Sequence, residues 1–163
     1  MGKNIVAEVF AKWQDIEYLE DFFEKYISDL KNWNSDVEDA IVKTMEQVKA
    51  FIVRLKMAGE NGQFDYTIFK PLHRNESFVD GLCTQSKAYG DGKGGSWLRM
   101  YAIRLGVNQY LITGGCIKLT QSMQGRPHTE LEIQKLKEVS NYLKNQGFRS
   151  IEDGDLDLLE IEI

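Results

Sequence analysis

The feature that most constrains the fold of this chain is a change of hydrophobic periodicity near residue 62. Before it, apolar residues recur every three or four positions over residues 15–30 and 35–59, which is the spacing of amphipathic helices. After it, residues 67–118 are rich in aromatic, β-branched and glycine residues, and helical spacing returns only at residue 129. Separate blocks of helix and strand predict an α+β fold built on one antiparallel sheet.

Local signals set the expected order of elements. Short runs of β-forming residues predict strands, and capping-box patterns such as Ser35 to Glu38 predict helix starts. We expect about four to five strands, with the helices packed on one face of the sheet and a helix at the C-terminal end of the domain. The expected elements are a strand at residues 4–11, helices at 15–30 and 35–59, strands at 67–72, 78–86, 96–105 and 109–118, and a helix at 129–146.

Charge is distributed unevenly along the chain of 163 residues, whose formal net charge is −5. Residues 61–150 carry 12 Lys and Arg against seven Asp and Glu, so the middle of the chain permits a site for a polyanion. The length fits one domain, residues 1–150, followed by an acidic tail, residues 151–163. Residues 159–163 alternate apolar with acidic residues, which suits an edge strand; a cover over the basic face and a disordered end are the alternatives.

Several classes of site are disfavoured by the composition. No run of about 18 apolar residues occurs, so we expect a cytoplasmic protein without a membrane partner. Cys83 and Cys116 lack the spacing of metal ligands, so we expect reduced core thiols in place of a disulfide or zinc site. His73 and His128 each stand apart from other ligand residues, and we expect neither a metal nor a cofactor.

Residues 90–95 read Gly-Asp-Gly-Lys-Gly-Gly, a literal match to the dinucleotide-binding pattern G-x-G-x-x-G. That pattern needs a helix directly after the glycines to hold a pyrophosphate, whereas residues 96–105 have the character of a strand. We therefore interpret the glycines as a connection between two strands.

The strand at residues 96–105 carries the most informative pattern. Alternation places Leu98 and Met100 on one side, facing the helices, and Arg99 and Tyr101 together on the other side. We expect Arg99 and Tyr101 to be accessible to solvent. Further basic side chains are expected around this face. One group follows the last strand: Lys118, Arg126 and His128. A second group lies in and just after the strand expected at 67–72: Lys70, His73 and Arg74.

Short motifs also follow one another in a set order. They are Lys70-Pro71-Leu72, Gly81-Leu82, Leu98-Arg99-Met100-Tyr101, the run Tyr-Leu-Ile-Thr-Gly-Gly-Cys-Ile-Lys-Leu-Thr at residues 110–120, and Pro127 before the last helix. With an N-terminal strand and helical hairpin, this order resembles the RelE/ParE superfamily of bacterial toxins, and it is most similar to the HigB branch. The resemblance covers most of the chain.

The resemblance implies the toxin component of a type II toxin–antitoxin system, acting as a ribosome-dependent endoribonuclease on messenger RNA. In that chemistry the ribose 2′-hydroxyl attacks the adjacent phosphate, which requires proton transfer and cationic stabilisation. By position, the resemblance assigns catalysis to Arg99, Tyr101 and Lys118. RNA contacts would come from the other basic residues of this region, Lys70, His73, Arg74, Arg126 and His128.

The implied partners are a cognate antitoxin protein, the ribosome and messenger RNA. Two alternatives stay open: a catalytically inactive RelE-fold module that binds protein, and a gyrase-directed toxin like those of the ParE branch. Thr84 and Ser86 stand where the family often has an acidic residue and an arginine, and the chain is acidic overall. These departures keep the inactive alternative open.

Overall fold

A computed structural model describes residues 4–65, 67–73, 84–91 and 95–147. The acidic tail and the first part of the strand expected at 78–86 lie outside these residues. The described helices are α1 (Ile5–Trp13), α2 (Ile16–Lys25), α3 (Ile27–Lys31), α4 (Val37–Asn61) and α5 (Pro127–Asn145). The described strands are β1 (Phe69–Pro71), β2 (Thr84–Tyr89), β3 (Leu98–Gly106) and β4 (Gln109–Ile117).

The strands form one antiparallel sheet in the order β1-β2-β3-β4, in which each strand pairs with the next along the chain. A sheet of this kind with separate helices before and after it confirms the predicted α+β class. The turn between β3 and β4 contains Asn108 at φ 56°, a left-handed conformation that asparagine tolerates better than most residues.

The N-terminal segment is a helix, so the strand predicted at residues 4–11 is wrong. Asn4 caps α1, because its side-chain oxygen accepts a hydrogen bond from the backbone N–H of Ala7 at 3.1 Å. Phe10 and Trp13 lie about one helical turn apart and both contact Phe51 of α4, with ring centroids 5.7 and 6.4 Å away. The β-forming composition misled the prediction, since burial in this segment follows the period of a helix.

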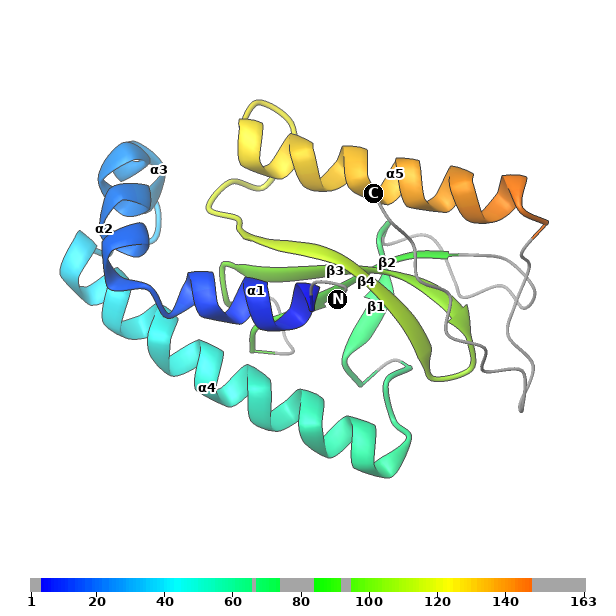
Figure 1. Cartoon of the computed structure of the whole chain (residues 1–163). Helices are drawn as coiled ribbons and strands as arrows, with labels where there is room; N and C mark the ends of the chain where they lie inside the picture. Colours follow the sequence, from blue (N-terminus) through cyan, green and yellow to red (C-terminus); the bar gives the residue numbers. More distant parts are fainter. Residues whose placement is uncertain (1–3, 66, 74–83, 92–94, 148–163) are drawn as a thin grey trace.

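The two predicted helices of the N-terminal hairpin are confirmed, with different ends. The helix expected at residues 15–30 is interrupted at Tyr26 and forms α2 and α3. The N-cap of α4 is Asp36, whose carboxylate accepts from the N–H of Asp39 at 2.9 Å, and the helix ends at Gly62 with φ 61°. These helices and α1 form one layer of the molecule (Figure 1).

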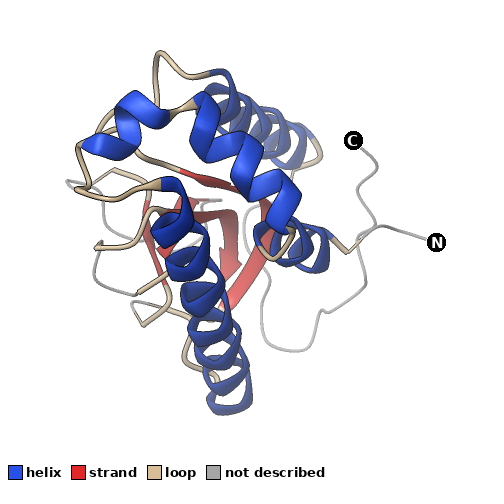
Figure 2. Ribbon diagram, turned by 90° about the vertical axis from the view of Figure 1, so that its left-hand side faces the viewer, coloured by secondary structure: helices blue, strands red, loops and turns tan. Residues whose placement is uncertain are grey.

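Helices cover both faces of the sheet, whereas the sequence predicted helices on one face (Figures 1 and 2). On one face, α1, α2 and α4 enclose a core with Leu98 and Met100. On the other face, α5 packs Leu136 against Tyr101 and Ile103. An amphipathic C-terminal helix needs an apolar surface to bury its own stripe, and the second face of β3 and β4 supplies it.

Two consecutive glycines allow helices to approach β4 from both sides. A Cβ on Gly115 would lie 2.8 Å from Val9 and 3.0 Å from Trp13, both on α1. A Cβ on Gly114 would overlap the carboxylate of Glu132 on α5. Glycine at these positions therefore lets α1 and α5 lie directly on the strand backbone.

Candidate functional site

Arg99 and Tyr101 are buried, so the predicted solvent exposure of both side chains is wrong. Arg99 has 8% of its surface exposed and Tyr101 has none. Leu98 and Met100 are also fully buried, as expected. Alternation along β3 does place the two pairs on opposite faces, but α5 closes over the Tyr101 side of the sheet.

Tyr101 lies too deep to exchange a proton with a ligand at the surface in this conformation. The thiol of Cys116 lies 3.9 Å from its hydroxyl oxygen and donates a weak hydrogen bond to it. Burial raises the pKa of the Tyr101 hydroxyl, and burial also raises the pKa of Cys116 to about 12. Both groups are therefore neutral at physiological pH, and the predicted catalytic role of Tyr101 lacks support from its position.

A group of cations surrounds the ring of Tyr89. This ring lies on the face of the sheet that carries Arg99 and Tyr101, on the side toward β1. Register places Lys70 opposite Lys87, and Tyr89 opposite Arg99. The ammonium nitrogens of Lys70 and Lys87 lie 5.5 and 5.6 Å from the ring centroid, and the guanidinium carbon of Arg99 lies 4.1 Å from it. We name these four residues, together with Lys118, the Tyr89 cluster.

Arg99 is the most constrained member of the Tyr89 cluster. Its Nη1 donates to the carbonyl oxygens of Ser96 and Leu98, the latter at 2.9 Å, while the guanidinium stacks on Tyr89. Burial lowers the pKa of Arg99, and the charge of nearby Asp91 opposes that shift. An arginine side chain nevertheless stays protonated in proteins, so it contributes a fixed positive charge.

Lys118 follows β4 and completes the Tyr89 cluster. Its ammonium group donates to the carbonyl oxygen of Gln121 at 2.5 Å. Partial burial lowers the pKa of Lys118, and the positive charges of Arg99 and Lys87 lower the pKa further. Lys118 thus lies within electrostatic range of Arg99 and Lys87, and its lowered pKa brings proton exchange closer to neutral pH.

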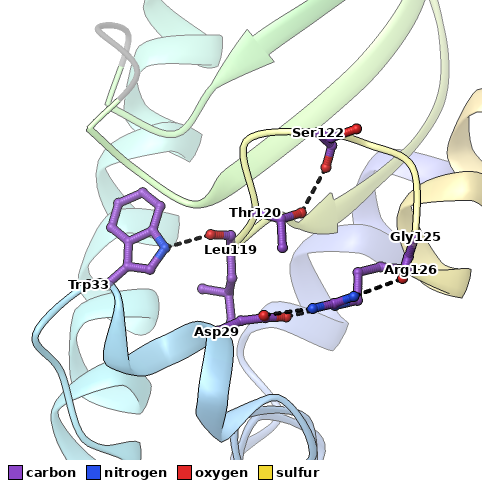
Figure 3. Close-up of polar contacts among 7 residues, drawn as sticks. All are labelled: Asp29, Trp33, Leu119, Thr120, Ser122, Gly125 and Arg126. Carbon is purple, nitrogen blue, oxygen red and sulfur yellow. Dashed lines mark hydrogen bonds and ion pairs between the residues drawn. The ribbon is translucent and has the colours of Figure 1, made fainter.

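Arg126, predicted to contact RNA, forms an ion pair within the protein. Its Nε and Nη2 each donate to the carboxylate of Asp29 at 2.7 Å, and the indole N–H of Trp33 donates to the Leu119 carbonyl at 2.8 Å (Figure 3). Hydrogen bonding and charge from Arg126 lower the pKa of Asp29. These contacts attach α3 and the residues after it to the connection between β4 and α5.

His128 is also separate from the Tyr89 cluster. His128 lies against the rings of Phe22 and Tyr26, with centroids 5.0 and 4.9 Å away, and its Nε2 is 2.9 Å from the carbonyl oxygen of Ile117. His73 is exposed in the bend after β1, and Arg74 lies outside the described residues. The structure thus brings together Lys70, Arg99 and Lys118 from the predicted set, and it places Arg126 and His128 against α2 and α3.

The sequence interpretation missed Lys87 and Tyr89. Strand alternation offers a signal for them: Lys87 and Tyr89 share one side of β2 and are half-buried, whereas Ser86 and Ala88 alternate with them and are buried. The predicted strand ended too early, at residue 86, and its pairing partner was not known. Only the register of β2 on β3 shows that Tyr89 lies beside Arg99.

Two features are absent from the part of the chain that the structure describes. No group of three or more His, Cys, Asp or Glu side chains is placed to hold a metal ion there. Within those same residues, no helix combines the length and the apolar character needed to cross a bilayer.

The arrangement of the Tyr89 cluster suits an anion that also carries a flat ring. Several cations can share the charge of a phosphate group, and an aromatic side chain offers a surface for stacking.

Comparisons of the chain with protein-family models, with curated proteins and with solved structures gave no match. The likeness to RelE/ParE toxins therefore rests on the sequence motifs alone.

Proposed function

We propose that the chain is a RelE-like toxin of a type II toxin–antitoxin system that binds messenger RNA at the Tyr89 cluster and cleaves it on the ribosome. The observation that carries the proposal is the convergence of Lys70, Lys87 and Arg99 on one tyrosine ring. Lys118 lies near enough to two of these cations that the charges of Arg99 and Lys87 lower its pKa. A cytoplasmic location and a cognate antitoxin belong to the same proposal, because the sequence resemblance implies both.

The proposed reaction needs no group beyond the RNA and these side chains. The ribose 2′-oxygen forms a bond to the adjacent phosphorus and loses its proton, while the bond to the 5′-oxygen breaks and that oxygen gains a proton. The products are a 2′,3′-cyclic phosphate and a 5′-hydroxyl. Arg99 and Lys87 stabilise the added negative charge on the phosphorane, and Lys118 exchanges the proton.

A second candidate is a RelE-fold binding module without catalytic activity. The burial of Tyr101 favours it, because the tyrosine that the resemblance assigns to catalysis has no exposed surface. A module of this kind would keep the fold and would bind a protein partner.

Inducible expression with mapping of RNA ends on ribosomes tests the proposal. The wild type should arrest growth and produce 5′-hydroxyl ends, and co-expressed antitoxin should relieve the arrest. Lys118→Gln should slow cleavage roughly a hundredfold, whereas Lys137→Gln, an exposed lysine on α5, should behave as wild type. A folded wild type that neither arrests growth nor cleaves RNA would refute the nuclease proposal and would favour the second candidate.

A further inference from the structure

Tyr89 is held in place from both sides of its strand. Arg54 on α4 donates through Nη1 to the backbone carbonyls of Tyr89 and Gly90, at 3.2 and 2.9 Å. Arg99 is itself anchored, because its Nη1 donates to the backbone carbonyls of Ser96, just before β3, and Leu98, in β3. Its guanidinium carbon lies 4.1 Å from the centroid of the Tyr89 ring. The ring and the guanidinium are therefore preorganised, which lowers the entropic cost of using them to bind a ligand.

Tyr89 is half-buried, so part of its surface remains accessible. Lys70 and Lys87 place their ammonium groups at 5.5 and 5.6 Å from the ring centroid. A ligand that reaches these ammonium groups therefore also reaches the ring.

We infer that Tyr89 is a stacking platform for an unpaired nucleobase, and that it makes the Tyr89 cluster selective for single-stranded RNA over duplex RNA. The inference rests on the proposed function, and it identifies the substrate class of that site. Lysine ammonium groups take the phosphate, and the ring takes the base next to it. Bases inside a duplex are stacked on their neighbours, so they have no free face to offer.

Binding measurements with three probes separate stacking from a purely structural role of the ring. The probes are a single-stranded RNA oligonucleotide, a blunt RNA duplex of the same length, and inorganic polyphosphate, which carries charge without bases. The wild type should bind the single strand more tightly than the duplex. Tyr89→Leu should weaken single-strand binding about fivefold to a hundredfold and should change polyphosphate binding less than about twofold. Tyr89→Phe should keep wild-type affinity for all three probes.

One substitution outside the Tyr89 cluster serves as the control for these binding measurements. Tyr142→Leu removes an exposed tyrosine of α5 outside the Tyr89 cluster and should leave all affinities unchanged. Equal losses of RNA and polyphosphate binding in Tyr89→Leu would overturn the inference, because the ring would then only arrange the cations. A wild type that binds duplex as tightly as single strand would also overturn it.

The outcomes distinguish this inference from the proposed function. If the wild type cleaves ribosome-bound RNA and Tyr89→Leu loses no affinity, the proposed function stands and the stacking role is wrong. If single-strand binding depends on Tyr89 but no RNA is cleaved, the stacking role stands and the nuclease proposal fails. A wild type that binds none of the RNA probes and cleaves no ribosome-bound RNA overturns both.

Discussion

Tyr101→Phe is the substitution that best separates the role implied by the family resemblance from the role that the fold gives this residue. The change removes one hydroxyl from a side chain with no exposed surface. The hydroxyl accepts a weak hydrogen bond from Cys116 Sγ at 3.9 Å, and the ring packs with Leu136 of α5. If the residue serves the core, the ring matters and the hydroxyl does not.

The expected magnitudes follow from these contacts. A typical intramolecular hydrogen bond contributes about 1 kcal/mol to the free energy of unfolding, and a thiol is a weaker donor than an amide. Loss of the hydroxyl also removes the cost of burying a polar group, so Tyr101→Phe should change the free energy of unfolding by less than about 1 kcal/mol. Tyr101→Ala, in contrast, should cost about 3–5 kcal/mol because it leaves a cavity under α5.

Urea unfolding and RNA cleavage or binding, measured on the same preparations, test these expectations. Tyr101→Phe should retain RNA activity within about a factor of three, while Lys118→Gln loses activity at unchanged stability. The reasoning is refuted if folded Tyr101→Phe loses activity a hundredfold or more. That result would mean that the hydroxyl takes part in the reaction, and that α5 moves away from the sheet when RNA binds.

Two further predictions concern contacts that hold the scaffold of the site. Asp65 accepts hydrogen bonds from Arg104 at 2.9 and 3.0 Å and from Tyr110 at 2.5 Å, so Asp65→Ala should destabilise the fold by about 3 kcal/mol at pH 7 by leaving the Arg104 charge buried. The hydrogen bonds from Arg104 and Tyr110 outweigh burial and lower the pKa of Asp65, so its contribution is complete above its unfolded pKa and is lost as the pH falls through the folded value. Urea midpoints of wild type and variant should therefore converge only as the pH falls below the unfolded pKa of about 3.9 and through the lower folded value, and a difference that stays constant down to acid unfolding would contradict the assignment. Gly114→Ala should cost about 1–3 kcal/mol by overlap with Glu132, and Glu132→Ala in the same chain should restore part of it; strictly additive losses would show that the two residues do not collide.

Local patterns in the sequence were sufficient for much of the fold. The apolar spacing of residues 35–59 predicts α4, and the alternation in β3 correctly separates Leu98 and Met100 from Arg99 and Tyr101. These features depend on the geometry of one element at a time, which sequence spacing encodes directly. The strand prediction for residues 4–11 is wrong because β-forming side chains there lie on a helix whose apolar face packs on the core, and packing outweighs intrinsic propensity.

Residue spacing along one strand is enough to tell which side chains share a face, whereas contacts between elements decide whether that face meets solvent or another helix. Tyr101 is buried because α5 returns over β3 and β4, an arrangement that joins segments distant in the chain. Likewise, Lys87 and Tyr89 join Arg99 only through the register of β2 on β3. Coverage and register both depend on contacts between elements, so a pattern within one element cannot specify them.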